Sequence, residues 1–233
     1  MIEKIKFMMV LLFSFAVLSQ CTASEKYFGD DDDEKPDGSS WVELGFYSPI
    51  QLFTEETTVE VFRLSIVYTY NKKVNGYDVG ILCDSADSNG VQFAGLNRTT
   101  GTMNGLSIGV ANVAHKEMNG VQIALLFNQA GTDTEQEGTV RKECSSSGFQ
   151  FSWTNCADGV FTGFQLGGFN ISTTMLKGFQ LGLLNIAERP LKEYEQFQTK
   201  EYKESKDNKT CLQIGIVNIN SKGFLPFSFF INF

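Results

Sequence analysis

The sequence predicts an all-β protein, an antiparallel meander closed as a β-barrel of about 10–12 strands, with a β-solenoid as the alternative. First, a short unit that begins with glycine recurs at a step of about 15 residues. Second, apolar residues occupy every second position of this unit, which is the period of a strand and not of a helix. Third, this alternation continues to the end of the chain, with Phe227, Phe229, Ile231 and Phe233 at every second place.

The first residues have the features of an export signal. Lys4 and Lys6 precede an apolar core over residues 7–18, which is too short to span a membrane comfortably. We therefore expect residues 1–20 to be a signal peptide. Two processing routes stay open. The segment that ends at Cys21 is similar to a lipobox, which makes Cys21 a lipidation candidate, although Gln20 stands where Gly or Ala is usual; the other route is ordinary cleavage after Ala23.

Residues 21–40 are expected to form a disordered, acidic spacer. Residues 24–40 are polar and rich in Gly, Pro and Ser, and they include four consecutive aspartates, Asp30–Asp33. Calcium loops space their ligands and place a glycine to turn the chain, so this run predicts a solvated segment and no metal site. The whole chain has a formal net charge of −8, which argues against a nucleic-acid partner.

Residues 41–233 are predicted to be one repeat-built β domain. Residues 41–53 and 59–70 are expected to be less regular strands, and the repeated units follow them. They are GYDVGILC from Gly76, GVQFAGLN from Gly90, GLSIGVAN from Gly105, GVQIALLF from Gly120, GFQFSWTN from Gly148, GFQLGGFN from Gly163, GFQLGLLN from Gly178 and CLQIGIVN from Cys211.

Each unit has two unlike faces. Its second, fourth and sixth positions are mostly large and apolar, whereas the third is usually Gln and the fifth Gly or Ala. Asn–Gly pairs at the start of several units predict tight turns. The repeated glutamines are expected to form hydrogen-bonded amide ladders inside the sheet and not a ligand-binding surface. They are Gln92, Gln122, Gln150, Gln165, Gln180 and Gln213.

In a barrel, the apolar face would contact lipid and the amide face would line the interior, as in outer-membrane barrels. The strand alternation up to Phe233 is also similar to the terminal strand of such barrels. One observation opposes a strict meander, because the insertions after the fourth and seventh units would leave it at opposite ends. A soluble barrel or sandwich and a β-solenoid with one coil for each unit stay open as alternatives.

The two insertions, residues 131–147 and 188–210, are expected to be solvated loops. Because binding surfaces concentrate on loops held by a rigid scaffold, they are the candidate contact regions for a protein partner. Cys144 and Cys156 flank one short stretch and form the candidate disulfide, with buried free thiols as the alternative. The cysteine spacing and a single histidine predict no metal site.

The sequence offers little catalytic chemistry. His115 is expected to be a polar turn residue, since the sequence places no further metal ligands or catalytic-triad residues beside it. Asp78 and Asp84 are the only close acids near a strand that could support hydrolysis, and we expect them at strand ends or in loops. The motifs of serine hydrolases, zinc proteases and P-loop proteins are absent from the sequence. We therefore expect neither an enzyme nor a cofactor.

The segments GVQIALLFNQA, GFQLGLLNIA and LQIGIVNIN, with SPIQLF before them and FLPFSFFINF at the end, resemble the leptospiral-type surface-repeat family of bacterial envelope proteins. The resemblance covers residues 41–233. Phe127 in place of the usual Asn and Cys211 in place of Gly depart from the pattern. The resemblance implies an envelope location, lipoprotein status in some members and no established enzyme activity.

The expected function is therefore that of an exported, non-enzymatic β-repeat protein of the bacterial outer membrane or cell surface. Such a protein would act structurally or through its loops, with the outer membrane as its expected partner. The alternative is a lipid-anchored soluble module that binds a host or envelope partner.

Overall fold

The strands that the structure describes form a single sheet. The structure, a computed structural model, describes residues 38–48, 50–131, 145–187, 210–220 and 225–233, without the side chains of residues 174–176 and 210. These residues belong to one unit, Asp37–Phe233, and the chain before it, Met1–Pro36, is a separate unit. The predicted signal peptide, Cys21 and nearly all of the predicted spacer lie outside the described residues.

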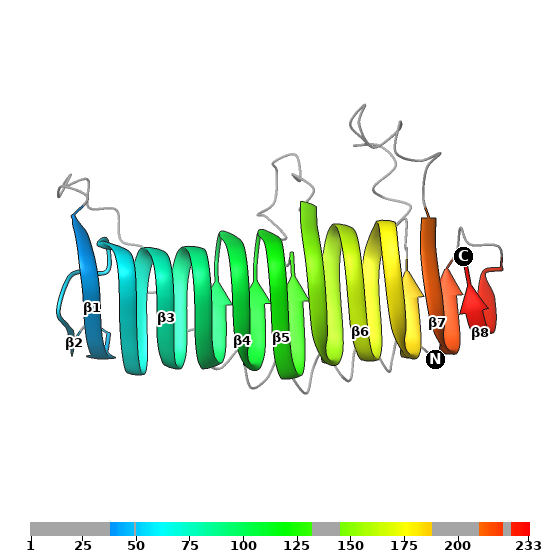
Figure 1. Cartoon of the computed structure of the whole chain (residues 1–233), viewed down its shortest axis with the longest axis horizontal. Coiled ribbons are helices and arrows are strands. Elements are labelled where there is room, and N and C mark those ends of the chain that lie inside the picture. The colour runs from blue at the N-terminus through cyan, green and yellow to red at the C-terminus, as the bar shows by residue number, and fades with distance from the viewer. Residues whose placement is uncertain (1–37, 49, 132–144, 188–209, 221–224) are drawn as a thin grey trace, which may run out of the picture. The chain divides into compact units, whose positions relative to one another are not determined.

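The described chain contains strands and no helix, which confirms the all-β prediction. In sheet order the strands run β2-β1-β3-β4-β5-β6-β7-β8, so nearly all sequential neighbours are also neighbours in space (Figure 1). The strands are β1 (Ser39–Tyr47), β2 (Ile50–Gln51), β3 (Thr58–Thr99), β4 (Thr102–Ala114), β5 (Glu117–Ala130), β6 (Ser145–Ala187), β7 (Thr210–Asn220) and β8 (Phe227–Asn232). β3 and β6 are 42 and 43 residues long, because each continues through several repeats.

Successive repeats stack in parallel, with equivalent positions side by side. Gly90 pairs with Gly105, Gly105 with Gly120 and Gly120 with Gly148 in the β3–β4, β4–β5 and β5–β6 ladders. In the β6–β7 ladder Gly178 pairs with Cys211. Each repeat is therefore one coil that lies on the coil before it, and we use "coil" in this sense below.

The predicted antiparallel meander is wrong, because the ladders that join the repeats are parallel. Antiparallel pairing occurs only at the two ends of the sheet, between β1 and β2 and between β7 and β8. The strand order runs from β2 at one end to β8 at the other, so closure into a barrel is not confirmed. The parallel stacking of the repeats agrees with the β-solenoid alternative. The error arose from the Asn–Gly pairs. Asn89–Gly90 and Asn104–Gly105 do not turn the chain into a hairpin but lie within strands and pair with each other in parallel.

The leading glycines are required by close approach between coils. Gly120 has φ of +141°, which favours glycine, and a Cβ there would lie 2.1 Å from the carbonyl oxygen of Gly105. The next leading glycine, Gly148, meets Gly120 in the same way. At Gly120 and Gly148 a side chain would push the coils apart, which explains why most units begin with glycine, although the last unit begins with Cys211.

The interior of the coils is polar or small. The third position carries buried Gln, the eighth position buried Asn, and the tenth position small residues such as Ala114 and Ala187. The apolar core cluster is small by comparison: Met103, Ala114, Met118, Ala130, Ala157, Phe161, Ala187 and Cys211. The two-faced unit of the sequence analysis is thus present, with its amide face enclosed.

The repeat is also more regular than the sequence suggests. The register shifts between Gly109 and Ala111, so that Asn128 and not Phe127 pairs with Asn112. One extra residue in β5 therefore accounts for the apparent departure at Phe127. With it counted, Ala130 and Ala187 hold the same position, so both insertions leave the coil stack from equivalent places. The objection that they would leave from opposite ends applies only to a meander.

Candidate functional surface and buried polar cluster

Two ladders of amide side chains join the coils from the inside. Asn112 donates to Asn128 Oδ1 at 2.9 Å and accepts from Asn97 Nδ2 at 2.8 Å, and the same bond is repeated along the row. The row consists of Asn97, Asn112, Asn128, Asn155, Asn170, Asn185 and Asn218. Each of the first six asparagines also donates to a main-chain carbonyl of the following coil, such as Ile123 O for Asn112.

The glutamine row behaves as predicted over most of its length. Gln150, Gln165, Gln180 and Gln213 each donate to the Oε1 of the preceding glutamine over 2.7–2.9 Å, which gives a continuous ladder that begins at Gln122. Ser107 occupies this position in the coil between Gln92 and Gln122. The glutamines from Gln122 to Gln213 thus bond to one another in the interior, whereas Gln92 donates to Asp78.

At the N-terminal end of the same row, charged residues replace glutamine. Glu43 pairs with Arg63 in the β1–β3 ladder, and Asp78 and Gln92 follow at the equivalent third position of the next two coils. Arg63 is fully buried and makes a two-pronged ion pair with Asp78, through Nε to Oδ1 at 2.8 Å and Nη2 to Oδ2 at 2.6 Å. Its Nη1 donates to Asn71 Oδ1 and to the carbonyl of Asp84.

The expectation that Asp78 and Asp84 lie at strand ends or in loops is wrong. Both are buried within β3, and Arg63 holds the Asp78 carboxylate while it contacts only the main chain of Asp84. They therefore do not form an open pair of carboxylates facing a substrate. The sequence analysis missed Arg63, although alignment of residues 61–68 with the first unit places it at the glutamine position.

Asp84 is the least satisfied group of this cluster. Its Oδ2 accepts from Arg98 Nη1 at 3.3 Å and from the Tyr68 hydroxyl at 3.4 Å, whereas its buried Oδ1 has no hydrogen-bond partner. Burial raises the pKa of Asp84 to about 6, and the nearby Arg98 and Arg63 oppose this rise. Burial also raises the pKa of the Tyr68 phenol.

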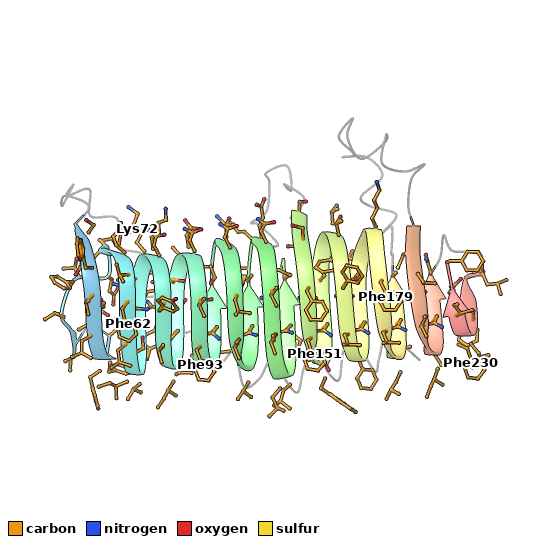
Figure 2. All side chains as sticks on the ribbon, viewed as in Figure 1. Phe62, Lys72, Phe93, Phe151, Phe179 and Phe230 are labelled. Atoms are coloured by element: carbon orange, nitrogen blue, oxygen red, sulfur yellow. The ribbon has the colours of Figure 1, made fainter. Side chains whose placement is uncertain are left out.

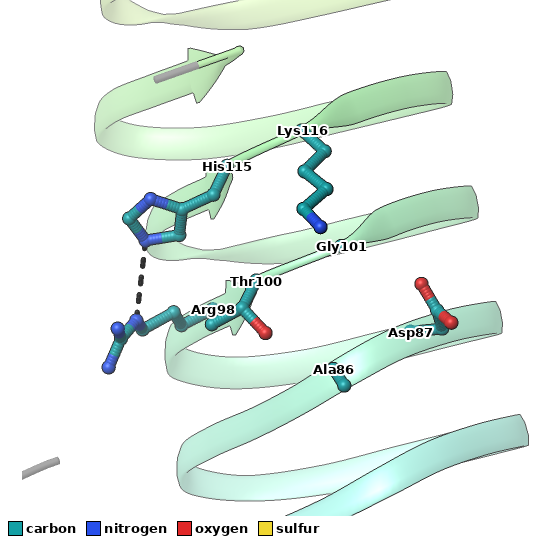
Figure 3. A pocket seen from close by; sticks show the side chains of 7 residues that line it. All are labelled: Ala86, Asp87, Arg98, Thr100, Gly101, His115 and Lys116. Carbon is teal, nitrogen blue, oxygen red and sulfur yellow. Dashed lines mark hydrogen bonds between the residues drawn. The ribbon is translucent and has the colours of Figure 1, made fainter. Parts of the chain in front are cut away.

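Next to this cluster is a shallow hollow of about 390 Å³, which lies over the end of β3 and the bends between β3 and β4 and between β4 and β5 (Figure 3). Its lining residues are Ala86, Asp87, Arg98, Thr100, Gly101, His115 and Lys116. His115 lies in the bend, as predicted, and its Nε2 accepts a hydrogen bond from Arg98 Nε at 3.3 Å. Asp87 accepts from the main-chain N–H of Thr102. Arg98 and Asp87 thus bond to protein groups, and the Thr100 hydroxyl donates to the carbonyl of Ser85.

The outer side of the coils carries the most extensive unusual feature, which we call the apolar face. It consists of the second, fourth and sixth positions of the coils that begin at Val61, Gly76, Gly90, Gly105, Gly120, Gly148, Gly163, Gly178 and Cys211. In Figure 2, Lys72 lies at the edge of the coils away from Phe93 and Phe151, two members of this face. The members are Phe62, Leu64, Ile66, Tyr77, Val79, Ile81, Val91, Phe93, Gly95, Leu106, Ile108, Val110, Val121, Ile123, Leu125, Phe149, Phe151, Trp153, Phe164, Leu166, Gly168, Phe179, Leu181, Leu183, Leu212, Ile214 and Ile216.

Some predicted site residues lie outside the described residues. These include Cys21, Cys144 and nearly all of the loops 131–147 and 188–210. Cys156 is half-buried in β6, and its pairing with Cys144 stays a prediction. Within the described ranges, no group of three or more His, Cys, Asp or Glu side chains is placed to hold a metal ion. No helix in the same ranges is long and apolar enough to cross a membrane.

Comparisons with known proteins yielded no match to a family model, a curated protein or a solved structure. The resemblance to leptospiral-type surface repeats therefore stays a prediction.

Proposed function

We propose that the protein is a non-enzymatic structural repeat protein of the bacterial cell envelope, a β-solenoid that is exported and held at the outer membrane or the cell surface. The observation that carries this proposal is the inverted distribution of its side chains. The amides are enclosed and bond to one another from coil to coil, while the large apolar side chains point outward. A large exposed apolar surface is typical of a protein that binds a membrane or another molecule.

Two further features support the proposal. The apolar segment 7–18 after Lys4 and Lys6 is typical of an export signal. The buried ionisable residues Arg63 and Asp78 are bound to each other, which is the arrangement of a structural ion pair. Stacked repeats of this kind provide a rigid, extended scaffold.

Cell fractionation tests this function. The full chain should sediment with the envelope and be released by detergent, whereas a control variant without residues 2–20 should stay in the cytoplasm. Recovery of the native protein in the soluble periplasmic fraction would contradict the proposal.

A lipid-anchored module that binds a host or envelope partner is the second candidate. It is favoured by the equivalent positions of Ala130 and Ala187, because insertions that start from one place on a scaffold can build a shared contact surface. Incorporation of a labelled fatty acid at Cys21, absent in Cys21→Ala, would support this candidate. Water solubility of the chain after removal of residues 1–37 would distinguish it from the first.

A further inference from the structure

We propose that the apolar face binds the acyl-chain surface of a lipid membrane, so that the coils lie along one leaflet. This inference rests on the proposed function and identifies the surface that makes the contact. It differs from a membrane-spanning barrel, in which every strand would cross the bilayer.

The composition of the face is the first argument. Its described members are apolar apart from Gly95 and Gly168, and none carries a charge. Many are well exposed: the exposed fraction is 58 % for Phe93, 70 % for Leu125 and 56 % for Ile216. These side chains are not a misplaced core, because the opposite side of each strand already fills the interior with bonded amides and alanines.

The size of the face is the second argument. Because neighbouring coils are separated by about 4.8 Å, the rows from Val61 to Cys211 extend for roughly 40 Å. The second to sixth positions of a coil span roughly 13 Å, which gives an area of about 500 Å². The largest apolar patch of a typical soluble monomer is about 300–600 Å² and is often functional, so this uncharged strip lies in the upper part of that range.

Lipid fits this surface better than a second copy of the chain. Two copies of a chain with a formal net charge of −8 would repel each other on approach, whereas a lipid surface without net charge would not repel the chain. Trp153 and the phenylalanines of the face are also side chains that interfacial proteins place in the boundary between head groups and acyl chains.

The chain that precedes the coils supports the same occupant. Cys21, the lipidation candidate, lies 17 residues before Gly38, and 17 residues reach at most about 60 Å when fully extended. This reach exceeds the length of the apolar face. A membrane that held the protein at Cys21 would therefore be accessible to every coil.

Tryptophan fluorescence can test the inference, because the chain has only two tryptophans, Trp41 and Trp153. The mature protein with Trp41→Phe keeps Trp153 as a reporter on the apolar face. The control carries Trp41→Phe, Trp153→Phe and Asp158→Trp, which moves the reporter to an exposed place further along the same coil. Both are mixed with phosphatidylcholine vesicles whose acyl chains are brominated, since bromine quenches only a nearby indole.

We expect Trp153 emission to shift to shorter wavelength and to lose more than half of its intensity, while the reporter at position 158 changes little. Leu125→Lys with Ile216→Lys should weaken vesicle binding at least tenfold. Circular dichroism should stay unchanged, because both side chains are well exposed.

Equal quenching of the two reporters, or none, overturns the inference. A dimer in sedimentation that these lysines dissociate, without quenching of Trp153, also overturns it in favour of a second copy. Envelope fractionation of the same variants separates the two proposals, since a chain that stays in the envelope without quenching leaves the proposed function intact.

Discussion

The buried asparagine ladder should contribute far more to stability than an exposed ladder of the same residue on the same strand. Asn112 and Asn104 both lie on β4 and both bond to asparagines of the neighbouring coils. Asn112 is fully buried, whereas Asn104 is exposed. Asn112→Ala and Asn104→Ala are therefore a matched pair that differs mainly in access to water.

The expected magnitude follows from the bonds. Asn112→Ala removes the bonds to Asn97, to Asn128 and to the carbonyl of Ile123, each worth about 1 kcal/mol net. It also leaves the Oδ1 of Asn128 without its donor inside the coil, which costs about 1–3 kcal/mol more. We expect a loss of about 4–6 kcal/mol. For Asn104→Ala we expect less than about 1 kcal/mol, because water replaces the lost partners.

Urea unfolding followed by far-ultraviolet circular dichroism gives the free energy of unfolding for each variant. Because stacked repeats can unfold in parts, amide hydrogen exchange of β4 and β5 provides a second, local measurement. The reasoning is refuted if the two variants are destabilised equally, or if Asn112→Ala costs less than about 1 kcal/mol. Either result would mean that the enclosed amides are not a main source of cohesion between coils.

Three further predictions concern backbone space and buried charge. Gly120→Ala should destabilise the protein by more than about 3 kcal/mol in urea unfolding, because the positive φ of Gly120 and the facing carbonyl exclude a Cβ. The control Gly95→Ala should cost less than about 1.5 kcal/mol. Similar losses in the two variants would contradict this prediction. Since burial raises the pKa of Asp84 from 3.8 to about 6, the folded state binds this proton more tightly, and its stability should rise by about 2 kcal/mol as pH falls from 6 to 4. Asp84→Asn should lack this gain in unfolding at pH 7 and pH 4, and an equal response in both proteins would argue against it. Arg63→Leu leaves the buried Asp78 carboxylate unpaired and should cost about 3–5 kcal/mol in thermal unfolding, part of which Asp78→Asn should restore; no recovery would show that the ion pair is not the cause.

The buried charges illustrate how far the sequence could be interpreted. An alignment of the repeat from Gly76 onward identifies Asp78 as an acid close to a strand but does not include its partner Arg63. Once Val61 is taken as the start of a coil, Arg63 falls on the glutamine position. The unpartnered oxygen of Asp84 has no such signal, since it depends on how side chains from several coils pack around it.

The strand period and the two unlike faces of each repeat can be predicted from the sequence alone, because they are local properties that recur along the chain. The structure was needed to show that Gly105 lies beside Gly120 in parallel, and that the neighbouring chain leaves no room for a Cβ at Gly120. A two-residue period is the same in parallel and antiparallel sheets, so it does not specify the direction of the neighbouring strand. An enclosed Asn112 is stable only when Asn97 and Asn128 stand directly before and after it, and that condition joins residues of different coils.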